Sequence, residues 1–215
     1  ILLSLVLSLG YTQEYYPLFS NDKNWQEQTL VPAEICQYSS GSLYFSKRDS
    51  LVQDVNYSII EAHPIVSLSD VPEYCPPYAI DTSQIFYSGL LREDVSEKKV
   101  YILIENEEYL LYDFTLEAGE SFSSQYATDG QELRIESIEA LILMNGQEVR
   151  RFHLSNGQYY TEGLGGSQGL LGPMITSLGF STAVQCIEDS DDKLYGDQCF
   201  DFISISNELN EPPFQ

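Results

Sequence analysis

Short runs of branched and aromatic residues, each bounded by polar residues, are the feature that most limits the folds open to this chain. Residues 84–91 (QIFYSGLL), 100–104 (VYILI) and 109–114 (YLLYDF) are three such runs, separated by the polar residues 92–99 and by the acidic turn ENEE. Runs this short are typical of strands, and no stretch of useful length has a helical period. We therefore expect a mainly β fold with little helix. Its antiparallel meander of hairpins would form a curved sheet, a sandwich or a partly open barrel.

Two Asn-Gly pairs predict the clearest local structure, a three-stranded meander between Glu132 and Glu162. Asn145-Gly146 and Asn156-Gly157 are each flanked by strand-like sequence. Asn-Gly readily adopts the two positive φ angles of a type I′ turn, which joins strands through a two-residue loop. Such a loop at Asn156-Gly157 places these residues opposite each other on the two faces of the hairpin: Leu154 with Tyr159 and Phe152 with Thr161, and Arg151 with Glu162 and His153 with Tyr160.

The ends of the chain differ in character from its middle. Residues 1–10 (ILLSLVLSLG) form an uncharged apolar run that is too short to span a bilayer as a helix, which takes about 20 residues. The run has the length of a signal-peptide h-region, and Ser8 and Gly10 are small residues of the kind found at a cleavage site. The alternative is a buried N-terminal strand or helix. We expect a signal-peptide remnant at 1–10, a single β-rich domain at 11–206, and a polar tail at 207–215 that leads into a missing C-terminal domain. The mature protein would be secreted or at the cell surface, without an integral membrane segment.

The four cysteines fit an exported protein, because disulfides form and persist in oxidising compartments. Cys36, Cys75, Cys186 and Cys199 can pair in three ways, and the sequence does not choose among them. We favour Cys186–Cys199, which closes a short acidic segment, with Cys36–Cys75 as the second bridge; buried free thiols are the alternative. A zinc site is not expected, since the chain has no CxxC motif and only two histidines.

The charge balance excludes two classes of partner. Ten Lys and Arg residues against 33 Asp and Glu residues give a formal net charge of −23. Such a surface repels phosphate backbones and anionic headgroups, so we expect neither nucleic acid nor a membrane surface as partner. The chain is nevertheless 43% hydrophobic, which predicts a folded domain rather than an acidic disordered tail. Strong negative charge also discourages edge-to-edge association of strands, and we expect a monomer.

Three groups of residues could carry chemistry, and the sequence favours a structural role for each. Residues 163–173 (GLGGSQGLLGP) lack the Lys and the helix of a phosphate-binding loop, so we expect a tight loop that crosses between strands. Residues 188–192 (EDSDD) fail the EF-hand pattern, and an exposed acidic hairpin tip is favoured over a calcium site. His63 and His153 have no accompanying nucleophile motif for a Ser-His-Asp triad. We therefore assign no catalytic, cofactor-binding or metal-binding residue.

A set of short motifs spread over residues 85–200 resembles a family of secreted bacterial proteins. The motifs are Gly89-Leu90-Leu91-Arg92-Glu93-Asp94, Lys99-Val100-Tyr101, Leu111-Tyr112-Asp113-Phe114 with Leu116 and Gly119, Phe152-His153-Leu154-Ser155-Asn156-Gly157, Glu162-Gly163-Leu164-Gly165-Gly166-Ser167, Gly169-Leu170-Leu171, Pro173, Cys186 and Leu194-Tyr195. Members of this family commonly end in a type IX secretion C-terminal sorting domain, which this sequence lacks. The resemblance implies export across both bacterial membranes to the cell surface or medium. It supplies no catalytic residues.

Two functional hypotheses follow from these observations. The first is an exported, non-catalytic β-rich domain that serves as an adhesion or interaction module for an extracellular glycan or protein. The second is a secreted hydrolase that uses acidic residues in a cleft. A pocket lined by converging carboxylates would favour the hydrolase, and a binding face without them would favour the first hypothesis.

Overall fold

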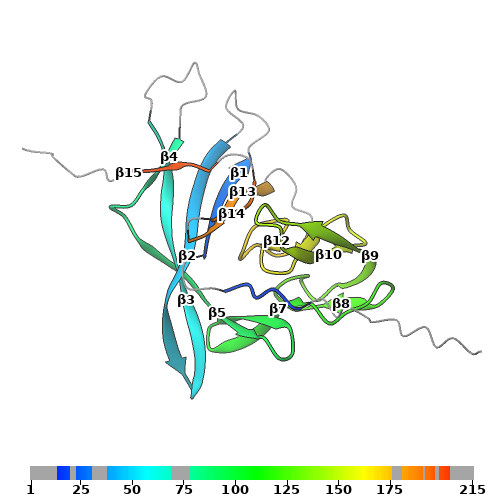
Figure 1. Cartoon of the computed structure of the whole chain (residues 1–215). Coiled ribbons are helices and arrows are strands. Elements are labelled where there is room, and N and C mark those ends of the chain that lie inside the picture. The colour runs from blue at the N-terminus through cyan, green and yellow to red at the C-terminus, as the bar shows by residue number, and fades with distance from the viewer. Residues whose placement is uncertain are drawn as a thin grey trace, which may run out of the picture.

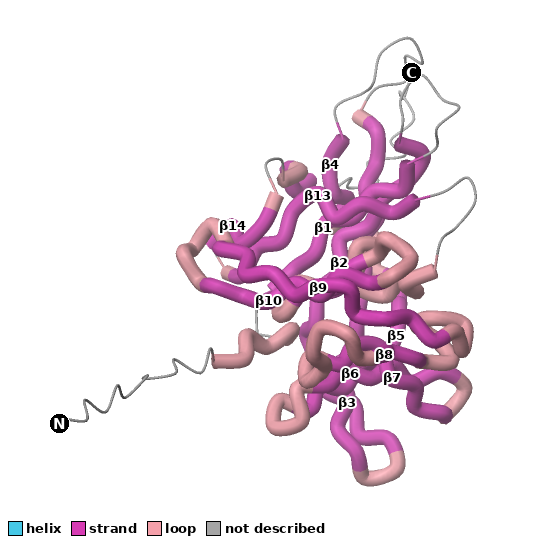
Figure 2. Tube along the Cα trace, turned by 90° about the vertical axis from the view of Figure 1, so that its right-hand side faces the viewer, coloured by secondary structure: helices cyan, strands magenta, loops and turns pink. Residues whose placement is uncertain are grey.

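The computed structural model describes residues 14–19, 23–30, 38–68, 78–175, 181–190, 192–196 and 199–203. All regular structure in these residues is strand (Figures 1 and 2), which confirms the predicted mainly β fold. The predicted signal remnant at 1–10 and the polar tail at 207–215 lie outside the described residues, as do Cys36 and Cys75.

The larger of two sheets has ten strands and curls into a half-barrel (Figure 1). Eight of them follow the order β14 (Asp192–Tyr195), β13 (Ser181–Asp189), β1 (Lys23–Leu30), β2 (Tyr38–Val52), β3 (Val55–Ser67), β5 (Phe86–Asp94), β6 (Lys99–Ile104) and β7 (Glu107–Asp113). Strand β4 (Tyr78–Asp81) pairs with β3 beyond the end of β5, and β15 (Asp201–Ile203) runs parallel to β4. The other pairings in this sheet are antiparallel. Because β1 lies between β2 and β13, the N-terminal strand has neighbours on both sides.

The smaller sheet has five antiparallel strands and provides the other side of the main core. Its order is β12 (Gly165–Gly166), β11 (Tyr159–Thr161), β10 (Glu148–Leu154), β9 (Glu132–Ile142) and β8 (Ser121–Ser123). One hydrophobic cluster joins both sheets, with Trp25 and Tyr112 from the larger sheet and Phe152 and Tyr160 from the smaller. The rings of Phe152 and Tyr160 stack with their centroids 4.9 Å apart and their planes 2° from parallel.

The predicted meander is present as β9, β10 and β11, but its register differs by one residue from the prediction. Phe152 lies opposite Tyr160, Arg151 opposite Thr161 and His153 opposite Tyr159. All four predicted pairs are therefore wrong: Leu154 with Tyr159, Phe152 with Thr161, Arg151 with Glu162, and His153 with Tyr160. The physical reason is burial, because the observed register places Tyr160 on the core face beside Phe152, whereas the predicted one pairs it with the half-exposed His153.

The turn geometry explains the shift of register. Gly157 has a φ of 82° but Asn156 does not have a positive φ, and the N–H of Gly157 donates to the carbonyl of Leu154 at 2.9 Å. Residues 155–157 thus form a three-residue loop, a type I turn followed by a left-handed glycine. The Asn145-Gly146 turn has the same pattern, with Gly146 at a φ of 84°. Two-residue turns with paired positive φ occur instead at Gln53-Asp54 and at Glu105-Asn106.

We expect Gly157→Ala to lower the free energy of unfolding by about 1 kcal/mol, because an alanine is strained at this positive φ. A Cβ at Gly157 would meet no atom within 4 Å, so the cost is purely conformational. Gly157→Asn is the matched control and should recover most of the loss, since Asn tolerates the left-handed region. Urea unfolding of the three proteins measures the effect. Equal stability of the alanine and glycine forms would contradict the assigned turn.

Two further turns connect strands. Of the polar residues 92–99, only residues 95–98 form a turn, since β5 continues to Asp94. Arg92 keeps the strand extended because it pairs opposite Tyr101, with its guanidinium 4.2 Å from the ring centroid of that residue. Residues 117–120 form a turn that is closed by the hydrogen bond from the N–H of Glu120 to the carbonyl of Glu117, at 3.0 Å.

Candidate binding site

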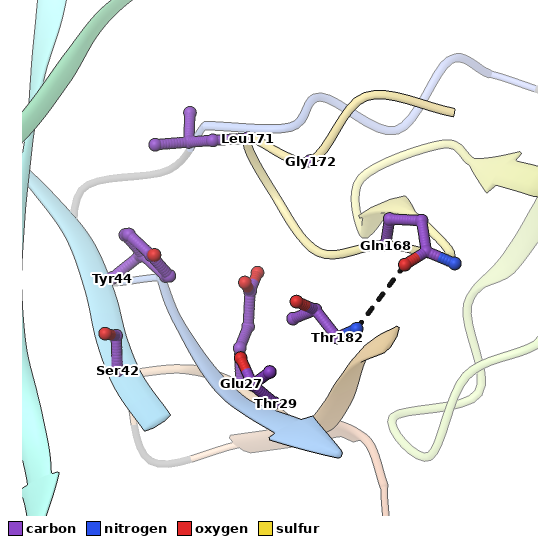
Figure 3. A pocket seen from close by; sticks show the side chains of 8 residues that line it. All are labelled: Glu27, Thr29, Ser42, Tyr44, Gln168, Leu171, Gly172 and Thr182. Atoms are coloured by element: carbon purple, nitrogen blue, oxygen red, sulfur yellow. Dashed lines mark hydrogen bonds between the residues drawn. The ribbon is translucent and has the colours of Figure 1, made fainter. Parts of the chain in front are cut away.

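A pocket of about 270 Å³ lies where β1, β2 and β13 meet the glycine-rich loop, residues 163–173. Figure 3 shows the carboxyl group of Glu27 projecting into the space between Tyr44, Leu171 and Thr182. The residues that line the pocket are mostly polar: Glu27, Thr29, Ser42, Tyr44, Gln168, Leu171, Gly172 and Thr182. The Thr182 N–H donates to the side-chain oxygen of Gln168 at 3.4 Å, which links β13 to the loop.

The alternation of side chains along β1 places Glu27 on the inner face of the larger sheet. Trp25, Glu27 and Thr29 share this face, and Glu27 lies opposite Ser42 of β2. The indole N–H of Trp25 donates to the carbonyl of Leu164 at 2.9 Å, so the strand also holds the start of the glycine-rich loop. Glu27 itself is 5% exposed. A carboxyl group is therefore fixed in the interior by two neighbouring strands.

The glycine-rich loop folds directly over this carboxyl group. The N–H of Leu170 donates to Oε1 of Glu27 at 2.5 Å, and the Tyr112 hydroxyl donates to the carbonyl of Leu170 at 3.0 Å. A Cβ on Gly169 would lie 2.2 Å from Oε2 of Glu27, so the loop reaches this position only with glycine there. The predicted tight loop is thus found, and its backbone closes the pocket.

Burial controls the protonation of the site. Desolvation raises the pKa of Glu27 from 4.5 to about 8, although the N–H of Leu170 opposes the shift. Burial also raises the pKa of the phenols of Tyr44, Tyr112 and Tyr126 above the ordinary value. At neutral pH the site therefore holds a mostly protonated carboxyl group among neutral hydroxyls.

Among the described residues, the two histidines contact a backbone carbonyl and an exposed carboxylate. His63 is buried in β3, where its Nδ1 lies 2.5 Å from the carbonyl oxygen of Gln84 and its ring stacks on Phe45 with centroids 4.9 Å apart. The Nε2 of His153 lies 3.0 Å from a carboxylate oxygen of the exposed Glu139. The His63 contact joins β3 to the residues just before β5, and the His153 contact joins β10 to β9.

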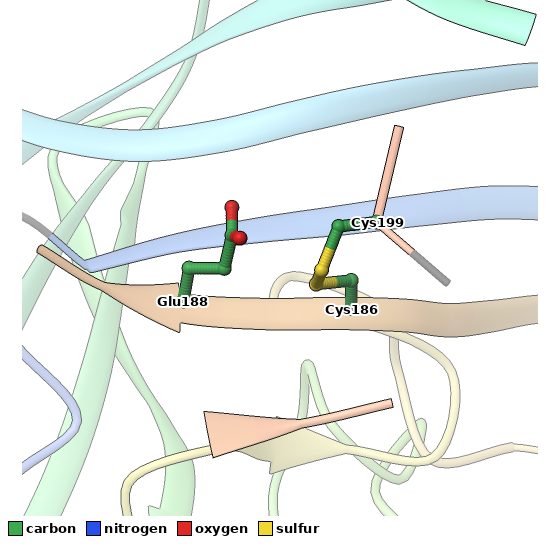
Figure 4. A group of neighbouring side chains, drawn as sticks. All are labelled: Cys186, Glu188 and Cys199. Atoms are coloured by element: carbon green, nitrogen blue, oxygen red, sulfur yellow. A yellow bond between two sulfur atoms is a disulfide. The ribbon is translucent and has the colours of Figure 1, made fainter. Parts of the chain in front are cut away.

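Cys186 and Cys199 form a disulfide with their Cα atoms 5.1 Å apart, which agrees with the favoured pairing (Figure 4). Glu188 lies beside this bridge, and its carboxylate comes within 4.8 Å of the sulfur atoms. Sulfur in a disulfide is not the thiolate that metals bind, so this cluster does not make a metal centre. Gln26 also accepts the N–H of Phe200 at 2.6 Å, and with the disulfide it holds residues 199–203 on the sheet.

The acidic residues 188–192 belong to the hairpin of β13 and β14. Asp189 lies opposite Asp192, and the exposed Ser190 has a φ of 57°. Asp191 lies outside the described residues. The position of these residues agrees with the expected hairpin tip.

Glu27, the residue on which this site is centred, is not predicted from the sequence. The segment NWQEQT gives no motif, and a single acidic residue among 33 carries no signal. One signal in the sequence could have indicated it. In a strand, Trp25, Glu27 and Thr29 lie on the same face, so a carboxyl group is expected beside a large apolar ring.

Comparison with known proteins returns no matching family model, no matching curated protein and no matching solved structure. Among the described residues, none belongs to a helix with the length and apolar character needed to cross a bilayer.

Proposed function

We propose that this chain is a non-catalytic β-rich binding domain of an exported protein and that it recognises an extracellular protein or glycan through the pocket at Glu27. The observation that carries the proposal is the pocket itself. A buried carboxyl group, several hydroxyls and one tyrosine converge beneath a loop that glycine residues allow to approach closely. Pockets that bind ligands are concave and carry a few fixed polar groups, as this one does.

The same lining argues against the hydrolase hypothesis. Hydrolysis of a glycoside by the usual route needs two carboxyl groups that flank the scissile bond. Of the described residues that line the pocket, Glu27 alone carries a carboxyl group. Glu27 with a raised pKa could donate a proton, but no second carboxylate of the lining stands ready to activate water or to attack the sugar.

The disulfide supports the proposal of export. Such bonds are rare in reducing compartments and common in secreted proteins. Cys186–Cys199 ties the C-terminal strand β15 to the sheet region that includes β1, the strand that carries Glu27. Export by the type IX route is part of this proposal and rests on the sequence resemblance.

Nitrogen-15 NMR of the full chain tests the binding role. Pools of mono- and disaccharides and of short peptides are added, and the amide resonances of Leu170, Gln168 and Thr182 report on the pocket. We expect at least one pool to shift these resonances while leaving those of the β2–β3 hairpin tip in place. The same pools and standard ester and glycoside substrates should show no turnover.

Two results would overturn the proposal. Turnover that is lost in Glu27→Gln would establish the hydrolase instead. Pocket resonances that stay fixed with every pool would contradict the recognition of a protein or glycan through this pocket.

A further inference from the structure

The two oxygens of the Glu27 carboxyl group are not equivalent. Oε1 accepts the N–H of Leu170, whereas no hydrogen bond from any described residue reaches Oε2. The carboxyl group nevertheless lies in the pocket lining, and the side chain is 5% exposed. A carboxyl oxygen that lies in a pocket lining and accepts no hydrogen bond is a group that a ligand can satisfy.

We propose that the pocket binds an alkylammonium group, such as the end of a lysine side chain, with Glu27 as its carboxylate partner. This inference rests on the proposed binding function of the same pocket. It adds the chemical class of the ligand.

The acceptors in the pocket suit an ammonium group. An ammonium carries three N–H donors that radiate from one atom, and it needs several separate acceptors. Glu27 provides one, and three residues that carry a hydroxyl group, Thr29, Ser42 and Thr182, line the same pocket. A guanidinium prefers both oxygens of one carboxylate, and here Oε1 already accepts the N–H of Leu170.

The size of the pocket suits a side chain rather than a whole organic ligand. Pockets for drug-sized molecules hold roughly 300–1,000 Å³. The volume of about 270 Å³ falls below that range. An ammonium group and a few methylene groups fit such a volume, with Leu171 and the ring of Tyr44 as apolar walls.

Charge favours the same ligand class. The lining contains no basic residue among those described, and the chain as a whole carries a formal charge of −23. A field of this sign attracts cations to the surface. Burial deprives the carboxylate of hydration. A cation that binds beside it compensates for this loss and stabilises the ionised form of Glu27.

Binding would therefore release a proton near neutral pH. The pKa of Glu27 is about 8 when the pocket is empty, and a bound ammonium lowers it. The other titratable groups that face Glu27 are the phenols of Tyr44 and Tyr112, with Tyr126 behind them, and burial keeps these neutral below pH 8. The ionisation of Glu27 therefore determines how ammonium binding depends on pH.

NMR titration at constant ionic strength tests the inference with four probes of similar length. These are n-butylammonium, N-acetyl-lysine methylamide, n-butylguanidinium and n-butanol. We expect both ammonium probes to shift the Leu170 and Thr182 resonances, and the Kd of n-butylammonium to fall about tenfold between pH 6 and pH 7. A lysine probe that binds at least as tightly as n-butylammonium indicates a polypeptide ligand, and one that binds much more weakly indicates a free amine.

Variants separate the pocket from the general negative charge. Glu27→Gln should weaken n-butylammonium binding at least about thirtyfold, because the charged partner is lost. Glu136→Gln removes the same charge from an exposed position of β9, and it should change the Kd less than about twofold. Ser42→Ala, which removes one acceptor, gives a second test that does not depend on the folding of Glu27→Gln.

The outcomes distinguish this inference from the proposed function. Sugars or n-butanol that shift the pocket resonances while both ammonium probes do not would refute the ligand class and leave the binding role in place. No shift with any probe or pool would refute both. A guanidinium that binds more tightly than the ammonium, or a Kd that does not change with pH, would also overturn the inference.

Discussion

Replacing Glu162 with alanine is expected to lower the free energy of unfolding by about 3–5 kcal/mol, the cost of leaving a largely buried charge without its partner. The side chain of Glu162 is 1% exposed, and its Oε1 lies 2.6 Å from Nη2 of Arg150. Its other oxygen accepts the backbone N–H of Arg150 at 3.1 Å. Arg150 also donates to the carbonyl of Phe114 at 2.7 Å, which connects the smaller sheet to the end of β7. Urea denaturation followed by tryptophan fluorescence measures the loss.

Glu139→Ala is the control for this prediction. Glu139 also pairs with an arginine of β10, but its side chain is 52% exposed, so its removal should cost less than about 0.5 kcal/mol. The pair of variants also tests the register, because the sequence placed Glu162 opposite Arg151. A double-mutant cycle should show strong coupling of Glu162 to Arg150 and none to Arg151. Coupling of Glu162 to Arg151 alone would contradict the observed register and support the predicted two-residue turn.

The second large effect concerns Glu27 and the pH dependence of stability. The pKa of Glu27 is raised to about 8 in the folded protein, against about 4.5 in the unfolded chain, so the folded state binds one more proton between these values. The stability that Glu27 contributes is therefore complete below pH 4.5 and is lost as the pH rises toward 8. Glu27→Gln cannot ionise and should not show this loss.

We expect the stability of the wild type relative to Glu27→Gln to fall by about 3 kcal/mol between pH 5 and pH 7.5, at about 1.4 kcal/mol per pH unit. Guanidinium chloride unfolding of both proteins across this range measures the difference, in which the other titrating groups cancel. The Glu136→Gln variant should run parallel to the wild type at every pH. A constant difference for Glu27→Gln would mean that Glu27 ionises as freely in the folded protein as in the unfolded one.

Much of the fold was predictable because it depends on local patterns. The run VYILI became β6, the acidic turn after it became a two-residue turn at Glu105-Asn106, and the residues between Glu132 and Glu162 became a meander. Apolar runs of this length, bounded by polar turns, are typical of buried strands and are shorter than most helices. The Cys186–Cys199 pairing was also favoured, since it closes a short segment that forms a hairpin.

The loop lengths and the site depended on contacts distant in sequence. Asn156-Gly157 accommodates both a two-residue and a three-residue loop, and the stacking of Tyr160 on Phe152 decides between them. The glycines of the loop are visible in the sequence, but the sequence does not predict what they allow. They allow the close approach of Gly169 to Glu27, which lies 142 positions earlier in the chain. No local pattern records a contact of that separation.

If Glu27 is a buried, neutral carboxyl group that serves as the partner of a cation, its own titration will show both properties. Carbon-13 NMR of the side-chain carboxyl, assigned by comparison with Glu27→Gln, gives the pKa in the free protein and in the presence of saturating n-butylammonium. We predict a pKa of about 8 in the free protein and a clear decrease when the amine binds. A pKa near 4.5 that the amine leaves unchanged would contradict both the buried state of the carboxyl group and its role as the partner of a cation.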